Sequence, residues 1–213
     1  GFARWSTPVL CAVPPLLGFV LPAFALLRLL VERGGGQLNA RFFAAALTSV
    51  TLAAIAAALT VTVAILLAYA RRAAPGRVTS AAAGIAGYGY ALPGSVIAVG
   101  ILIPMTFVDR WINRMMVETF DIRTGLLITG TMAGLIFAYV VRFAAPALEA
   151  TEAGFQRITP SIAAAARTLT ASRGEALRRV HAPLIAPAVL TAALVVFVDA
   201  MKELPATLLM RPM

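Results

Sequence analysis

The sequence predicts an all-α polytopic membrane protein, and two observations support this prediction. Of its 213 residues, 61% are hydrophobic and 13% are charged, whereas about 25% of the residues in a soluble domain are charged. Five long runs also contain no Asp, Glu, Lys or Arg: Ser6–Leu27, Phe42–Ala70, Val78–Val108, Thr124–Val141 and Ala182–Val198. Because about 20 apolar residues cross the hydrocarbon core as a helix, we expect five transmembrane helices in a single domain that covers residues 1–213.

The first two runs predict helices of different regularity. Three prolines, Pro14, Pro15 and Pro22, interrupt the first run, so we expect its helix to kink. The second run has no proline and is 29 residues long, which corresponds to about 44 Å at the rise of an α-helix. This exceeds the thickness of the hydrocarbon core, so we expect the second helix to tilt or to extend past the membrane.

The third run is expected to be broken. Four glycines and one proline lie within Gly84–Gly94, and Pro93 has no N–H and disfavours a helical conformation at Leu92. Irregular backbone at membrane depth is tolerated only where it is buried in protein or lines a cavity. One interpretation is a bend beside a translocation path, with Tyr90, Pro93 and Gly94 as path residues. The other interpretation is an ordinary kink that serves packing.

The last two runs are slightly short for a membrane crossing. We expect the fourth helix to continue through Phe143–Leu148, with Arg142 reaching toward the membrane surface, and the fifth to continue through Ala200–Met201. Between the third and fourth runs, Asp109–Arg123 carries charges of both signs. We interpret it as a short extracytoplasmic amphipathic segment without site chemistry.

The net charge of +9 is distributed unevenly among the predicted loops. Basic residues concentrate after the second run (Arg71, Arg72 and Arg77) and after the fourth (Arg142, Arg157, Arg167, Arg173, Arg178 and Arg179). Because cytoplasmic loops are enriched in Lys and Arg, we expect these two loops and the N-terminus to face the cytoplasm. The basic excess is therefore a signal of membrane orientation, and no nucleic-acid partner is expected.

Several kinds of chemical site are not expected in this sequence. A nucleotide-binding P-loop needs Gly-Lys followed by Ser or Thr, but the one lysine, Lys202, follows Met201. The one cysteine, Cys11, allows no internal disulfide and no cysteine-based metal site. His181 has no second His or Cys at ligand spacing, so we interpret it as a helix-end or interfacial residue. We therefore expect no catalytic residues, no bound metal and no cofactor.

The basic stretch from about residue 149 to residue 183 predicts a docking element. It contains two expected short helices, Ile162–Leu169 and Thr170–Val180, and Ser172 is a candidate cap because Glu175 follows three residues later. Such helices can insert into a partner's cleft, here with an apolar face of Ala171, Ala176 and Leu177 and a charged rim of Arg173, Arg178 and Arg179. The alternative is an amphipathic loop that lies on anionic lipid. Near the start of the stretch, Glu149 and Glu152 are expected to pair with Arg142 or Arg157.

Several segments resemble ABC-importer permeases of the binding-protein-dependent type. The basic stretch is similar to their EAA loop: Ala165, Ala166 and Pro183 match its pattern, Val180 replaces isoleucine, and Ala164, Thr170 and Ala182 depart from glutamate, glycine and leucine. KELPATLL at residues 202–209, YALPGS at residues 90–95 and LLAYARR at residues 66–72 resemble the ferric-iron permeases of this type. Of these, KELPATLL is the most specific.

The resemblance implies a transport subunit of the bacterial inner membrane that hydrolyses no ATP itself. The implied partners are a cytoplasmic ABC ATPase subunit, a periplasmic solute-binding protein and a second permease half, fused or separate, with membrane lipid around them. The chain would then be the C-terminal half of a longer polypeptide. The residues expected to couple to the ATPase are Ala165, Ala166, Arg167, Thr170, Ala171, Ser172, Glu175, Leu177, Arg178, Val180 and Pro183. Ala164 removes a carboxylate contact, and Thr170 would be strained if its corner needs a positive φ.

Three charged residues lie together at the end of the fifth run. Asp199 and Glu203 are four residues apart and share a helical face, with Lys202 beside them. Since carboxylates suit a hard cation, one hypothesis is a polar mouth through which a ferric ion or its chelate passes. The alternative is a self-satisfied charge cluster that anchors the end of the helix.

The sequence therefore predicts import of ferric iron by alternating access, driven by a separate ATPase. A permease for another solute, such as thiamine, a polyamine or sulfate, remains open, because the loop pattern is common to many importers. An ATP-independent secondary transporter would be expected to carry charged residues near the middle of its helices, and the charge-free runs argue against it. A membrane-anchored scaffold that holds a soluble partner is the third class of function.

Overall fold

The computed structural model describes residues 10–33, 39–169 and 172–210, and every regular element in these ranges is helical. The predicted all-α class is therefore confirmed. The elements are η1 (Leu16–Val20), α2 (Leu21–Arg33), α3 (Ala40–Ala73), α4 (Arg77–Ala91), α5 (Gly94–Phe120), α6 (Met132–Gln156), α7 (Pro160–Leu169), α8 (Arg173–Ala176), η2 (Leu177–His181), α9 (Ala182–Lys202) and α10 (Pro205–Met210), where η marks a π-helical turn. Within the described ranges, five helical segments could cross a membrane: Leu10–Glu32, Ala40–Ala73, Gly94–Phe120, Met132–Gln156 and Gly174–Lys202.

The chain divides into two compact units, Gly1–Thr48 and Ser49–Met213. In the first unit, the segment Leu10–Glu32 contains the π-helical turn η1, in which the Leu21 N–H donates to the Leu16 carbonyl. This π-helical turn lies between Pro15 and Pro22, two of the three prolines that were expected to kink the helix. No residue of Leu10–Glu32 is buried.

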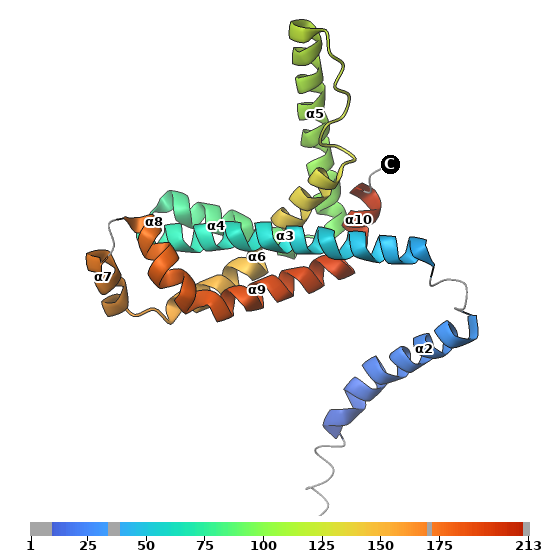
Figure 1. The fold of residues 1–213 in the computed structure, drawn as a ribbon, viewed down its shortest axis with the longest axis horizontal. Helices are drawn as coiled ribbons and strands as arrows, with labels where there is room; N and C mark the ends of the chain where they lie inside the picture. The colour runs from blue at the N-terminus through green and yellow to red at the C-terminus, as the bar shows by residue number, and fades with distance from the viewer. Residues whose placement is uncertain (1–9, 34–38, 170–171, 211–213) are drawn as a thin grey trace, which may run out of the picture. The chain divides into compact units, whose positions relative to one another are not determined.

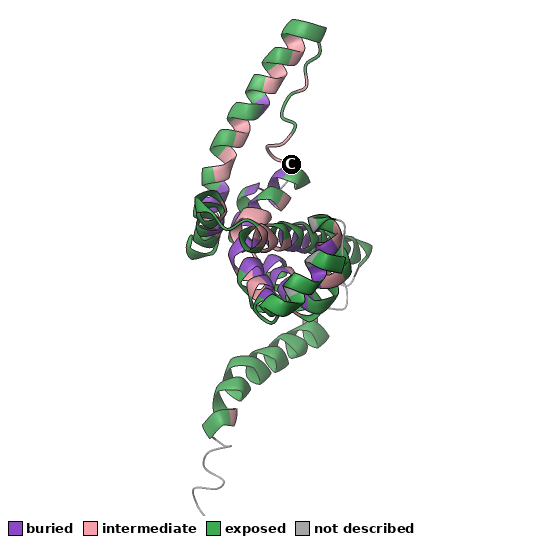
Figure 2. Cartoon of the chain, turned by 90° about the vertical axis from the view of Figure 1, so that its left-hand side faces the viewer, coloured by how far each residue is buried: buried purple, intermediate pink, exposed green. Residues whose placement is uncertain are grey.

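Helix α6 is the centre of the second unit. Helices α4 and α9 both pack against it, as Figure 1 shows, and Tyr139 and Phe143 of α6 are the two largest fully buried side chains among the described residues. Helix α6 is apolar on most of its circumference, so it can be covered on several sides at once. The buried residues accordingly gather inside the helical bundle, as Figure 2 shows.

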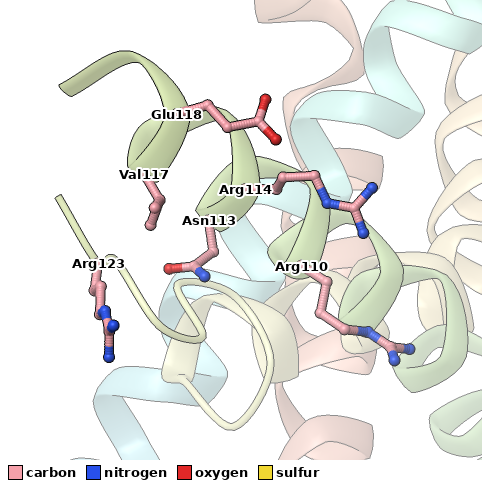
Figure 3. Close-up of a pocket in the computed structure, with 6 residues that line it drawn as sticks. All are labelled: Arg110, Asn113, Arg114, Val117, Glu118 and Arg123. Carbon is pink, nitrogen blue, oxygen red and sulfur yellow. The ribbon is translucent and has the colours of Figure 1, made fainter. Parts of the chain in front are cut away.

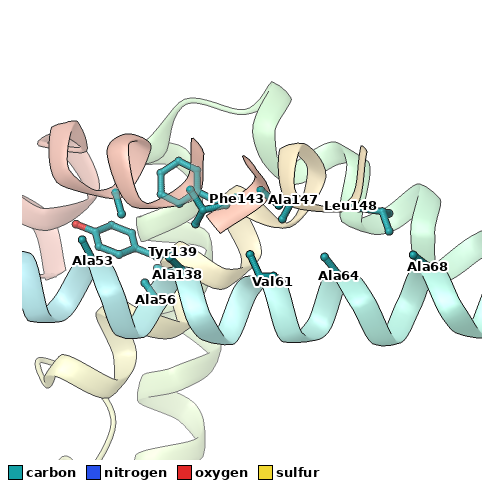
Figure 4. Packing of buried hydrophobic residues seen from close by; sticks show 14 of the residues in the cluster. Ala53, Ala56, Val61, Ala64, Ala68, Ala138, Tyr139, Phe143, Ala147 and Leu148 are labelled. Atoms are coloured by element: carbon teal, nitrogen blue, oxygen red, sulfur yellow. The ribbon is translucent and has the colours of Figure 1, made fainter. Parts of the chain in front are cut away.

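Helix α3 contributes a stripe of small residues to this core. Its buried residues recur at intervals of three and four and so share one face: Ala53, Ala56, Ala57, Thr60, Val61, Ala64 and Ala68. Figure 4 shows the stripe alongside Tyr139, Phe143 and Leu148 of α6. The buried Thr60 hydroxyl donates to the Ala56 carbonyl at 2.7 Å, so its hydrogen bond is satisfied inside the helix. Helix α3 has 34 residues, and is therefore even longer than its charge-free run.

The third predicted span is two helices in the structure. Helices α4 and α5 are separated at Leu92 and Pro93, which confirms the predicted bend. Helix α4 stays in the bundle with α3, α6 and α9, whereas α5 runs away from it, as Figures 1 and 2 both show. The start of α5 contacts α6 and the short helix α10.

Helix α5 also continues to Phe120, so the expectation that the helix ends before Asp109 was wrong. Asp109 is fully buried and accepts hydrogen bonds from the N–H groups of Leu127, Ile128 and Thr129, at 3.1, 3.0 and 2.7 Å. Asn113 accepts two more from the N–H groups of Thr124 and Gly125. Because the returning chain satisfies these polar side chains, the helix need not end where the charges begin. Helix α6 then starts at Met132, eight residues after the predicted Thr124.

The basic stretch forms helices, but its second helix does not end where expected. Helix α7 begins at Pro160, and the Ser172 hydroxyl oxygen accepts the Glu175 N–H at 3.2 Å, as predicted for the cap. Helices α8, η2 and α9 then form one continuous segment, Gly174–Lys202, so the expected boundary between Val180 and the fifth span is absent. Pro183 lacks an N–H and crowds the preceding turn, and the helix widens there into the π-helical turn η2 instead of ending.

Candidate functional site

The break between α4 and α5 exposes a backbone carbonyl inside the second unit. Leu92 and Pro93 have ψ angles of 142° and are extended, so the Leu92 carbonyl has left the hydrogen-bond ladder of α4. The Arg142 side chain, from the middle of α6, donates to this carbonyl from Nη1 at 2.6 Å. One arginine therefore satisfies the backbone group that the proline break releases.

A second break lies between α9 and α10. Glu203 is extended, with a ψ of 96°, and Leu204 precedes Pro205, which favours extended backbone and ends α9. The Thr207 hydroxyl donates to the Glu203 carbonyl and shares a hydrogen bond of 2.5 Å with the Tyr139 hydroxyl of α6. Side-chain hydroxyls thus hold this second corner against α6.

Arg142 joins the two breaks. Its Nε donates to Glu203 Oε2 at 3.0 Å, and the Arg142 and Glu203 side chains are 17% and 9% exposed. The same guanidinium therefore binds the α4–α5 break through Leu92 and the α9–α10 corner through Glu203. Removing either side chain would leave the other as an unpaired charge in a partly buried position, which is unfavourable.

Asp199 forms a second pair close to the same corner. The Lys202 Nζ lies 2.7 Å from Asp199 Oδ1, and the Asp199 side chain is 10% exposed whereas that of Lys202 is 69% exposed. The Tyr90 hydroxyl of α4 lies 3.5 Å from Asp199 Oδ2. We refer to the side chains around this corner as the polar hub. It consists of two separate groups: one contains Tyr90, Asp199 and Lys202, and the other contains Tyr139, Arg142, Glu203 and Thr207. Its two cations and two anions balance.

Two glycines allow the backbone to approach α6 and the hub. A Cβ on Gly94 would lie 2.0 Å from Glu203 Oε1, and a Cβ on Gly89 would lie 2.1 Å from the Val141 carbonyl oxygen of α6. Both distances are far below contact distance, so a side chain at either position would require the neighbouring groups to move. The glycine-rich pattern of the third run therefore reflects close helix packing as well as the bend.

The structure brings the five predicted path residues together. Tyr90, Pro93 and Gly94 lie at the first break, Asp199 and Glu203 at the second, and Arg142 links the two. Sequence reasoning missed Arg142, Tyr139 and Thr207. Arg142 was expected to extend to the membrane surface, and Glu152 was expected to pair with Arg142 or Arg157. Both expectations were wrong, because Arg142 pairs with Glu203 and Glu152 pairs with Arg71 of α3.

The expected ATPase-coupling residues have mixed environments. Ala165 and Arg178 are exposed, as is Pro183, whereas Ala166 is 1% exposed and Ala176 is 3% exposed. Leu177 packs against the chain's own core. Of the predicted apolar docking face, Ala176 is buried and Leu177 is half-buried, and both contribute to the internal packing of the helical bundle. Thr170 and Ala171 lie outside the described residues, as does the side chain of Arg167.

The end of the bundle next to this stretch is held by Arg72 and His181. Arg72 of α3 donates to the carbonyls of Phe155 and Ile158, at the C-terminal end of α6, where a cation is favourable. His181 is 6% exposed and its ring lies 5.6 Å from that of Tyr69 and 6.3 Å from that of Phe155. His181 is the last residue of η2, but it lies inside the continuous helix Gly174–Lys202, so the expected helix-end position was wrong. Its ring contacts join this helix to α3 and α6.

Within the described residues, no group of three or more His, Cys, Asp or Glu side chains could hold a metal ion. Residues 61–210, which contain the polar hub and the basic stretch, match the family described as binding-protein-dependent transport system inner membrane component. The chain belongs to this family. A comparison with curated proteins finds no match.

Membership of this family makes the chain a permease subunit of an ABC importer, a multi-pass membrane protein that works with an ABC ATPase and a solute-binding protein. The region matched starts within α3 and ends with α10. Both helix breaks of the permease therefore lie inside the family region, together with α7, α8 and η2.

Proposed function

We propose that this permease imports ferric iron by alternating access, driven by its partner ATPase and supplied by the solute-binding protein. The observation that carries the proposal is the polar hub, in which one arginine ties together two helix breaks. Discontinuous helices are where transporters place their binding sites and their moving parts. A contact between two such breaks is therefore in the right place to control a path through the subunit.

The hub acts as a gate in this proposal. In the structure, Asp199 is paired with Lys202, and Glu203 with Arg142, so neither carboxylate is available to a cation. Moving Arg142 away from Glu203 would free a carboxylate and, at the same time, release the Leu92 carbonyl. The separation of the two helix breaks and the exposure of carboxylate oxygen ligands would thus occur together. Such ligands suit a hard cation such as ferric iron, and the KELPATLL resemblance supports the same substrate.

The continuous helix Gly174–Lys202 provides a mechanical link to the ATPase. Its 29 residues correspond to about 44 Å at the rise of an α-helix. One end carries the exposed Arg178 and Arg179, in the stretch proposed to dock the ATPase, and the other end carries Asp199 and Lys202. A displacement of α8 by the ATPase would be transmitted along this helix to the hub.

The test is ATP-dependent uptake of ferric iron into proteoliposomes that contain the full-length permease, its ATPase and its binding protein. We expect uptake by the unmodified permease, and a loss of at least about ten-fold in the Asp199→Asn, Glu203→Gln variant, because both proposed ligands lose their charge. The matched control is Glu118→Gln, which removes an exposed carboxylate outside the hub.

Three results would contradict parts of this proposal. Full uptake by the double variant would remove the hub from the path. ATP hydrolysis stimulated by another solute, without iron uptake, would leave an importer with a different substrate. An ATPase that fails to associate with the permease would remove the proposed driving force.

A further inference from the structure

The distal part of α5 carries a basic hollow that the proposed transport mechanism does not use. It is open, has a volume of about 510 Å³, and is lined by Arg110, Asn113, Arg114, Val117, Glu118 and Arg123. Figure 3 shows these side chains on α5 and on the returning chain beside it. Among the described residues, none of the three arginines forms an ion pair. Three cations and one carboxylate therefore give the lining a net positive charge.

The three guanidinium groups do not converge on one point. In Figure 3, Arg110 and Arg114 extend on one side of α5, whereas Arg123 extends from the returning chain on the other side. This arrangement does not suit a single small anion enclosed by the hollow. It suits several anionic groups arranged around the end of the helix.

An exposed apolar stripe runs along α5 as far as the basic hollow. Ile103, Phe107, Trp111 and Met115 are 68%, 70%, 58% and 47% exposed, and their four-residue spacing places them on one face. The first part of α5, from Gly94 to Val108, carries no charge and corresponds to about 22 Å of helix. The helix is therefore free of charge up to Val108, and its exposed basic residues begin at Arg110, next to Trp111. Tryptophan and arginine at such a boundary are typical of the interface between hydrocarbon and headgroups.

We propose that Arg110, Arg114 and Arg123 bind the phosphate groups of anionic phospholipids around the distal end of α5. The apolar stripe contacts the acyl chains, and the net positive charge of the lining favours headgroups that carry a net negative charge. Apart from the returning chain that Asp109 and Asn113 hold in place, this part of α5 lies outside the helical bundle. Bound lipid would support the distal part of α5, which no other helix of the described chain contacts there. This inference does not depend on which solute is transported.

Trp111 provides a local probe of this lipid. In the full-length permease in lipid nanodiscs, with every tryptophan except Trp111 replaced by phenylalanine, we would measure quenching by phospholipids with brominated acyl chains. We expect the apparent affinity of the sites near Trp111 to be at least about five-fold higher for brominated phosphatidylglycerol than for brominated phosphatidylcholine. A preference of about five-fold is what the attraction between one interfacial arginine and an anionic surface would produce. The Arg110→Gln, Arg114→Gln, Arg123→Gln variant should lose this preference, and the corresponding lysine variant should keep it.

The controls separate other occupants and other effects. An Arg41→Gln, Arg77→Gln, Arg157→Gln variant loses the same charge at exposed positions elsewhere and should leave the preference at Trp111 unchanged. Excess inorganic phosphate should also leave it unchanged. Equal quenching by the two lipids, a preference that survives in the glutamine variant, or a preference abolished by inorganic phosphate would each overturn the proposal. If Trp111 is protected from the brominated lipids only when the binding protein is added, the surface is a protein contact and the proposal is overturned.

Discussion

Replacing Arg142 by methionine should destabilise the permease by up to about 3–5 kcal/mol, the cost of breaking a fully buried pair, because it leaves the partly buried Glu203 carboxylate without its partner. The same change removes the donor to the Leu92 carbonyl, so both helix breaks lose their common contact. Thermal unfolding of the purified permease in detergent measures the loss of stability. Uptake in proteoliposomes should stop, because the gate would no longer have a defined closed state.

A second substitution separates stability from transport. In the Arg142→Met, Glu203→Gln variant both charges are gone, and much of the stability should return, because a buried pair replaced as a whole costs far less than a pair broken on one side. Transport should stay absent. If the single Arg142→Met variant unfolds at the temperature of the unmodified permease, the pair does not hold the two breaks together. If the double variant transports normally, the hub is structural only.

Gly89→Ala is expected to have the second largest effect. The new Cβ would lie 2.1 Å from the Val141 carbonyl oxygen, a backbone atom of α6 that cannot move aside as a side chain can. Helix α4 would have to shift away from α6, and we expect a loss at or above the roughly 1–3 kcal/mol typical of overpacking. Thermal unfolding of the purified variant is the measurement.

Gly87→Ala is the matched control on the same helix, since nothing lies within 4 Å of its added Cβ. Alanine is the better helix former, so this change should be neutral or stabilising by up to about 1 kcal/mol. Equal unfolding temperatures for the two variants would contradict the close approach of α4 to α6.

The features that the sequence predicted correctly are those with local causes. The helices follow from the charge-free runs, the break at Pro93 follows from a missing N–H and local crowding, and the Ser172 cap follows from its spacing to Glu175. Tyr90, Pro93, Gly94, Asp199 and Glu203 were each chosen for local reasons. Their meeting at one place depends on how α4 and α9 pack on α6, which no local pattern contains.

The features that were missed depend on distant partners. Arg142 sits in a mostly apolar helix, where an arginine can either reach the surface or find a buried acid, and its acid is 61 residues away in the sequence. Asp109 was interpreted as the start of a loop. The sequence does not show that N–H groups about 20 residues later donate hydrogen bonds to its carboxylate. Pro183 was read as a boundary, because a proline usually ends a helix, but a π-helical turn accommodates it here.

The central claim is that the α4–α5 break and the α9–α10 corner separate during transport. The most direct test links them covalently, in a Leu92→Cys, Leu204→Cys variant made in a Cys11→Ser background, with the two exposed positions beside the hub joined by a reducible thiol cross-linker. ATP-driven uptake should be normal before cross-linking, stop after it and return on reduction, while the single-cysteine variants stay active throughout. Uptake at the full rate by the cross-linked permease would contradict the account.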